Sequence, residues 1–151
     1  MRSVYRALAG LIAIGVVVQA MSVALGWFTA IKDMDDGQVI DKNTDFNLGQ
    51  SLHGMIGMMI IPLLALLLLI VSFFARVEGG VKWALLVVGL VALQIALAFV
   101  AFFGAPAVGA LHGLNAFALL WAAGMAARKA AASPPAAAPT ESPAEPTEAA
   151  R

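Results

Sequence analysis

The chain has 151 residues, of which 62% are hydrophobic and 12% charged, and its formal net charge at pH 7 is zero. This apolar fraction is far above that of soluble domains, and the length suits one membrane domain with a short tail. The sequence contains no cysteine, which excludes disulfides, thiolate metal sites and thiol redox relays. No basic patch indicates nucleic acid as a partner.

Four hydrophobic segments are each long enough to cross a hydrocarbon core of ~30 Å as a helix. They are residues 7–30, 55–75, 81–103 and 107–127. They lack the alternation of barrel strands, and helices satisfy their own backbone groups in lipid. The sequence therefore predicts an all-α membrane protein, an up-down-up-down bundle of four transmembrane helices over residues 1–129. Pro62 lies inside the second segment and predicts a kink there.

Residues 130–151 differ from the rest of the chain in composition. They are mostly Ala, Pro, Ser, Thr and Glu, with no large apolar side chain. Such a segment cannot bury enough surface to offset the loss of chain entropy. We therefore expect a disordered cytoplasmic tail.

Lysine and arginine are distributed unevenly between the two ends of the predicted helices. Six flank one end and two the other: Arg2, Arg6, Arg76, Lys82, Arg128 and Lys129 against Lys32 and Lys42. The positive-inside rule then predicts a multi-pass protein of the inner (plasma) membrane with both termini in the cytoplasm. A cleaved signal peptide is the competing interpretation of the N-terminus. The first apolar run continues to Ala30, which is longer than an ordinary signal-peptide core of 7–15 residues.

The only two histidines, His53 and His112, stand in the same phrase, Leu-His-Gly. They fall at the outer ends of the second and fourth hydrophobic segments. The first and third segments share a second pattern, in which Gln19 and Gln94 are each followed nine residues later by a phenylalanine. The two halves agree in order and depth, which predicts two helical hairpins related by duplication. We expect both glutamines to form hydrogen bonds between helices.

In an up-down-up-down bundle, the second and fourth helices are diagonal partners, roughly 12–14 Å apart. Two imidazoles reaching inward could hold a metal between them, since each bond is about 2 Å long. Ionisable residues within membrane spans usually mark function, and a histidine pair in an apolar bundle favours a haem iron. One turn inward from the histidines lie Gly57 and Ala116, whose small size would leave room for a flat macrocycle or for close helix packing. The sequence thus predicts a haem iron as the metal centre, with His53 and His112 as metal ligands and Gly57 and Ala116 lining the site.

The two Leu-His-Gly phrases on the second and fourth of four spans resemble one four-helix half of haem A synthase. The chain also looks similar to small four-span actinobacterial membrane proteins, a family without an assigned function. The first resemblance implies a single haem b site of the cofactor-holding kind, with His53 and His112 as its ligands. One departure matters, because the catalytic half of haem A synthase has a glutamate three residues before a histidine, where this chain has Gln50. A haem-modifying oxygenase is therefore not expected.

Three functional interpretations remain open. The first is a cytochrome-like protein that passes electrons or holds haem, with a membrane redox partner or a quinone beside it. The second is a structural or accessory subunit whose histidines only form hydrogen bonds across the bundle. The third, a carrier or channel, is disfavoured because no acidic or basic residue lies within a span. No nucleophile–base pair, intramembrane carboxylate or phosphate loop favours an enzyme, and the lipid bilayer is the one partner that the composition requires.

Overall fold

The computed structural model describes residues 1–132 and confirms an all-α bundle with four helices long and apolar enough to span a membrane. The elements are α1 (Arg2–Asp35), α2 (Leu48–Met55), a π-helical turn (Ile56–Ile60), α3 (Ile61–Ser72), α4 (Gly80–Phe103), a short 3-10 helix (Pro106–Val108) and α5 (Gly109–Ala132). The second span consists of α2, the π-helical turn and α3. Residues 133–151, most of the predicted tail, lie outside the described part of the chain.

The second span begins earlier than its hydropathy predicts. Asn47 caps α2, because its side chain accepts a hydrogen bond from Gln50 N at 3.1 Å while Asn47 N donates to Gln50 Oε1 at 3.0 Å. This reciprocal capping box starts a helix through polar residues that a hydropathy profile does not include. As a result, His53 lies within a helix rather than just before one. At the other boundaries, α1 continues past residue 30 to Asp35, and α5 continues past residue 127 to Ala132.

The helix disturbance predicted at Pro62 takes the form of a π-helical turn. The turn covers Ile56–Ile60 and ends just before the proline, which lies in the first turn of α3. Proline lacks a backbone N–H and interrupts the regular ladder. A π-helical turn is one of the local rearrangements that accommodate such an interruption.

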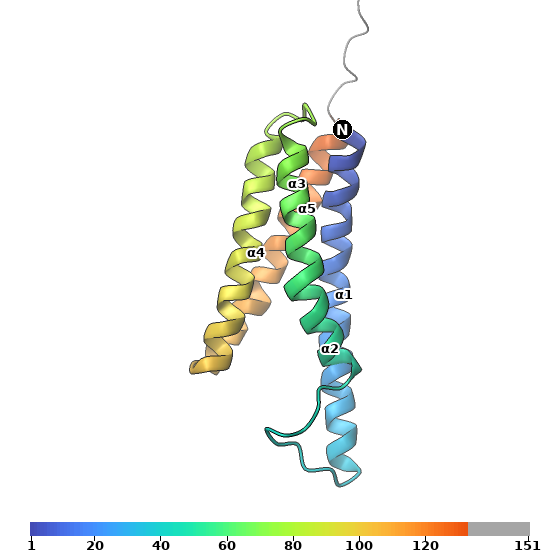
Figure 1. Ribbon diagram of the computed structural model, residues 1–151, viewed down its shortest axis with the longest axis vertical. Coiled ribbons are helices and arrows are strands. Elements are labelled where there is room, and N and C mark those ends of the chain that lie inside the picture. The colour runs from blue at the N-terminus through green and yellow to red at the C-terminus, as the bar shows by residue number, and fades with distance from the viewer. Residues whose placement is uncertain (133–151) are drawn as a thin grey trace, which may run out of the picture.

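The order of helices around the bundle follows from which of them pack together. Helix α1 packs against α3 and α5, and α4 packs against the same two helices. The second and fourth spans are therefore diagonal partners, as the up-down-up-down topology predicts. Figure 1 shows Met1 and the described end of α5 at one end of the bundle, which we call the terminal end. We call the opposite end, where the loop between α1 and α2 lies, the histidine end.

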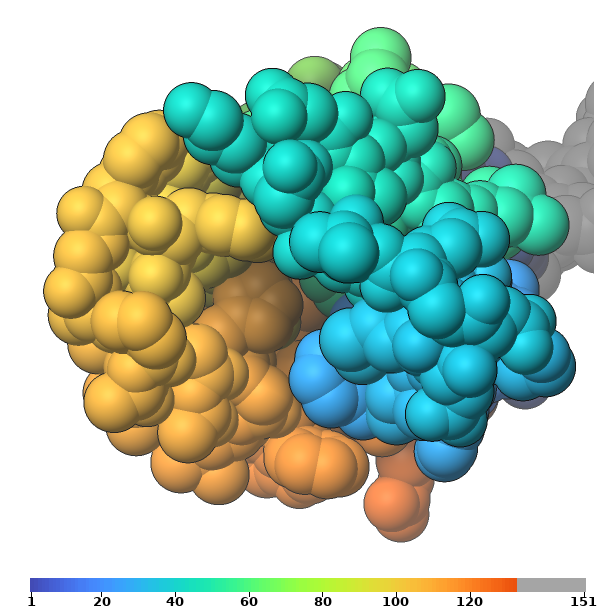
Figure 2. Space-filling model, turned by 90° about the horizontal axis from the view of Figure 1, so that it is seen from below, coloured from blue at the N-terminus to red at the C-terminus, as the bar shows by residue number. Residues whose placement is uncertain are grey.

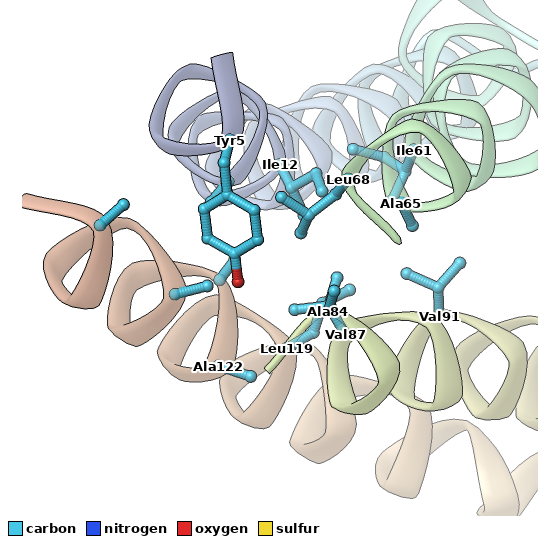
Figure 3. Packing of buried hydrophobic residues seen from close by; sticks show 14 of the residues in the cluster. Tyr5, Ile12, Ile61, Ala65, Leu68, Ala84, Val87, Val91, Leu119 and Ala122 are labelled. Atoms are coloured by element: carbon cyan, nitrogen blue, oxygen red, sulfur yellow. The ribbon is translucent and has the colours of Figure 1, made fainter. Parts of the chain in front are cut away.

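The hydrophobic core fills only the terminal half of the bundle. Figure 3 shows side chains from all four spans converging there, and the largest fully buried ones are Tyr5, Ile12, Leu68 and Val87. The Tyr5 hydroxyl donates to Gly80 O at 2.9 Å, which ties α1 to the start of α4. Toward the histidine end, the core ends at one residue on each span: Val16 on α1, Ile61 on α3, Val91 on α4 and Leu119 on α5.

Beyond this core, α1 and α2 stay together while α4 diverges from them (Figure 1). The contact between α1 and α2 depends on small residues, since a Cβ on Gly49 would overlap the backbone of Gly26. Ser22, Gly26 and Ala30, all buried, follow one another at intervals of four on the same face of α1. This is the small-residue spacing that allows membrane helices to approach closely. On α4, by contrast, no residue past Val91 is buried.

Candidate functional site

The structure brings the two predicted histidines together just beyond the end of the core. His53 on α2 and His112 on α5 have ring centroids 6.1 Å apart, with the ring planes inclined at 59°. Both side chains are half-buried. Residues separated by almost sixty positions thus form one pair inside the bundle, because the second and fourth spans face each other diagonally.

Each ring is oriented by the helix beside it, most clearly at His112. Its Nδ1 lies 2.9 Å from Gln94 O, and because a carbonyl oxygen only accepts, Nδ1 carries the proton and donates it. The other ring nitrogen, Nε2, is then left with a free lone pair. Gln94 Nε2 donates in return to His112 O at 2.9 Å, so α4 and α5 are joined by two reciprocal bonds. This confirms the expected interhelical role of Gln94.

Asn115 completes this half of the site, and the sequence analysis missed it. It is buried on α5, and its Nδ2 donates to Gln94 Oε1 at 2.5 Å and to Leu90 O at 2.9 Å. These bonds set the orientation of the Gln94 amide. The available signal was a polar side chain within an apolar span, three residues after a histidine and therefore near it on the helix surface.

The other half of the site repeats this arrangement with longer contacts. His53 Nδ1 lies 3.3 Å from Gln19 O. With the Gln19 amide oriented to satisfy its neighbours, its nitrogen donates to His53 O at 3.1 Å and its oxygen accepts from Gly57 N at 3.3 Å. The amide thus lies between two backbone groups that an α-helix would pair with each other, at the start of the π-helical turn. The same nitrogen is 2.8 Å from His53 Nδ1.

The two small residues predicted to line the site lie against protein atoms. A Cβ on Gly57 would be 3.1 Å from the side-chain amide of Gln19, so the small size of this residue makes room for that amide. Ala116 is half-buried and packs against the hydrophobic core. The glycines that directly follow the histidines are different, because a Cβ on Gly54 or Gly113 would meet nothing within 4 Å. Both glycines are exposed, and within residues 1–132 no other helix packs against these two positions.

The histidine end of the bundle is hollowed. Viewed from that end, α4 and α5 on one side and α1 and α2 on the other border a recess (Figure 2). The buried residues of α4 recur every three or four positions and end at Val91. The same spacing continues through Gln94 to Ala98 and Ala101, so the inward face of α4 carries small side chains at this end. The site is therefore a polar layer of two histidines and their amide partners, with the core on one side and an open space on the other.

Within residues 1–132, neither histidine Nε2 forms a hydrogen bond with the protein. In the same range, no group of three or more His, Cys, Asp or Glu side chains could hold a metal ion. The described chain thus offers two imidazole donors, and Gln50, which stands where haem A synthase has its glutamate, is used to cap α2.

No family model, curated protein or solved structure matches the chain. The four apolar helices identify a four-span membrane protein, and the resemblance to haem A synthase stays an expectation that depends on the histidine phrases.

Proposed function

We propose that this protein holds one haem b in the membrane, with His53 and His112 as the two axial ligands, and that it passes electrons or carries haem. The observation that carries the proposal is the 6.1 Å separation of the ring centroids. Two iron–nitrogen bonds of about 2 Å each, with about 1 Å from each Nε2 to its ring centre, require a separation of about 6 Å. The rings already have the spacing that a metal between them needs.

The hydrogen bonds to Nδ1 also favour ligation through Nε2. Histidines that bind metals commonly donate their other N–H to a carbonyl or carboxylate, which selects the tautomer and orients the ring. Gln94 O serves this purpose for His112 at 2.9 Å, and Gln19 O is available to His53 at 3.3 Å. A ring whose Nδ1 is bound to the neighbouring helix turns its Nε2 edge away from that helix. Because α1 and α4 lie on opposite sides of the bundle, these two bonds favour Nε2 edges that face a common centre.

A macrocycle fits a site with two protein donors, because it supplies the remaining metal ligands in its own plane. The recess at the histidine end provides room for a flat apolar group. Haem would supply one-electron redox chemistry when bound. The residues of this chain would bind it, orient it and keep it apart from the packed core. Because the pair lies toward one end of the bundle, electron transfer across the membrane would require a membrane redox partner or a quinone.

The proposal is tested by the absorption spectrum of the full chain, produced in haem-replete cells and purified in detergent. We expect a Soret band and a low-spin, reduced-minus-oxidised difference spectrum. His53→Ala and His112→Ala should each remove one axial bond and change that spectrum, and the double variant should abolish binding. Leu52→Ala and Leu111→Ala, next to the histidines, are matched controls that should leave the spectrum unchanged.

Folded wild-type protein without a Soret band would overturn the proposal. The histidines would then act only through their bonds to Gln19 and Gln94, which join α1 to α2 and α4 to α5. That outcome supports the alternative of a structural or accessory membrane subunit. In that case, His53→Ala and His112→Ala would lower the stability of the bundle with no spectral effect.

A further inference from the structure

The two halves of the site differ three residues after each histidine, where Asn115 follows His112 but Ile56 follows His53. Asn115 donates to Gln94 Oε1 and to a backbone carbonyl of α4. The Gln94 amide nitrogen is therefore kept on His112 O, and it makes no hydrogen bond to the His112 ring. Among the described residues 1–132, the one hydrogen-bond partner of the His112 Nδ1 is a carbonyl oxygen, which accepts only from a protonated nitrogen.

His53 has two hydrogen-bond partners that require opposite tautomers. Gln19 O, 3.3 Å from Nδ1, accepts only when Nδ1 is protonated, and this leaves Nε2 free. The Gln19 amide nitrogen, 2.8 Å from the same Nδ1, donates only when Nδ1 is bare, and this leaves the proton on Nε2. In the first state the ring can bind a metal through Nε2, and in the second state it cannot.

The helices that carry the histidines are also held differently. Helix α5, with His112, packs against both α1 and α4, whereas α2, with His53, packs against α1 and leads into the π-helical turn. Helix α2 is therefore held by fewer neighbouring helices than α5. This difference in helix packing, like the difference in hydrogen bonds, favours a more fixed position for His112 than for His53.

We infer that the two histidines are unequal donors. His112 is the fixed ligand, Asn115 is the residue that positions it through Gln94, and His53 is the exchangeable ligand, with Gln19 providing its alternative state. The consequence for haem depends on the proposed function. A small neutral ligand such as carbon monoxide would replace His53 on reduced iron, as the bond from iron to Nε2 breaks and an iron–carbon bond forms. The released ring would take a proton on Nε2 and give up the one on Nδ1.

The first experiment needs no haem. Nitrogen NMR of the haem-free protein, labelled with ¹⁵N-histidine in lipid nanodiscs, distinguishes the two neutral tautomers, and single-histidine variants assign the signals. We expect His112 to be protonated on Nδ1 alone and His53 to populate both tautomers. Asn115→Leu should give His112 the mixed signal, and Gln19→Leu should leave His53 protonated on Nδ1. Identical tautomer populations at the two histidines would overturn the inference.

The second experiment follows carbon monoxide binding to the reduced, haem-loaded protein. Loss of the Gln19 amide in Gln19→Leu should weaken carbon monoxide binding by about tenfold, the effect of about one hydrogen bond. His53→Ala should keep haem and bind carbon monoxide, whereas His112→Ala should lose most of its haem. Leu114→Ala, exposed beside Asn115, is the control expected to match the wild type.

The outcomes separate this inference from the proposed function. Haem that is bound equally well by both single-histidine variants, with carbon monoxide affinity unchanged in Gln19→Leu, would overturn the inference and leave the proposed function standing. A wild-type protein that binds no haem would overturn the proposed function. The tautomer measurement would still decide whether the two histidines differ.

Discussion

At the scale of single residues, backbone carbonyls determine what the histidines can do. An imidazole beside a carbonyl oxygen holds its proton on the facing nitrogen and keeps the other nitrogen as a donor. Gln94 O imposes this state on His112, and the buried Asn115 maintains it by holding the Gln94 amide. Two amide side chains and one carbonyl thus determine which nitrogen of the His112 ring donates a hydrogen bond.

Haem release in acid is the first prediction at this scale. An imidazole must be deprotonated at Nε2 to bind iron, so protons compete with the metal for both histidines. Affinity therefore falls as the pH falls, and the Soret band of the purified protein should diminish on acidification and recover on return to neutral pH. A Soret band that persists in acid until the helices unfold would contradict ligation by two imidazoles.

The hydroxyl of Tyr5 provides the second prediction. It donates to Gly80 O in the buried terminal half, so Tyr5→Phe leaves a carbonyl without its partner. We expect a loss of about 1 kcal/mol in the free energy of unfolding, measured by thermal denaturation in detergent. Phe74→Leu, on the exposed surface near the same end, should change stability by less than about 0.5 kcal/mol. Equal stability of Tyr5→Phe and the wild type would show that the bond contributes nothing.

At the scale of elements, three structural features determine the position of the second span. A capping box starts it at Leu48, a close glycine contact holds it against α1, and a π-helical turn precedes its proline. Asn47 strengthens the first two features, because its Nδ2 also donates to Gly26 O at 2.8 Å. Together they place His53 within a helix and at the level of His112.

The glycine contact between α1 and α2 gives the third prediction. In Gly49→Ala the new Cβ meets the backbone of Gly26, which cannot move aside as a flexible side chain would. We expect destabilisation of about 1–3 kcal/mol, as for other overpacked sites, together with a loss of haem binding. Gly10→Ala is the matched control on α1, since its Cβ would meet nothing within 4 Å and should be neutral or stabilising by up to about 1 kcal/mol. If both variants behave alike, the close approach is unimportant.

At the scale of the whole molecule, the packed core and the candidate site occupy opposite halves of one bundle. The core ends at Val16, Ile61, Val91 and Leu119. Past these residues, α4 diverges from α1 and α2, and the bundle opens toward the histidine end (Figures 1 and 2). The packed half can therefore supply stability without the open half, which is the half that the proposed haem would occupy.

Membrane orientation is the prediction that belongs to this scale. Both described chain ends lie at the terminal end, and the lysine and arginine count predicts that this end faces the cytoplasm. A protease site inserted after Gly37, in the exposed loop of the histidine end, should be cut from outside in right-side-out vesicles. A C-terminal tag should be protected in the same vesicles. Cleavage of the tag from outside would show that the terminal end faces outward and that the predicted orientation is wrong.

Hydropathy alone was enough to predict the all-α fold, the number of spans and their order, because each apolar run exceeds the length that a bilayer demands. It was less informative at the ends of the helices. The start of the second span depends on Asn47 and Gln50, whose reciprocal bonds begin a helix among polar residues. The extension of α1 to Asp35 likewise lies outside any apolar window.

The sequence by itself determined the class of the protein and the order of its four spans. It also determined the pairing of His53 with His112, because a repeated phrase on alternate spans can meet only across a diagonal. Only the tertiary structure decided how each histidine is held. The position of a backbone carbonyl relative to a ring depends on helix rotation and spacing, which no local pattern specifies. The difference between the two histidines also depends on tertiary packing, since Asn115 acts on His112 through Gln94, which belongs to another helix. Its effect exists only once α4 and α5 have packed together.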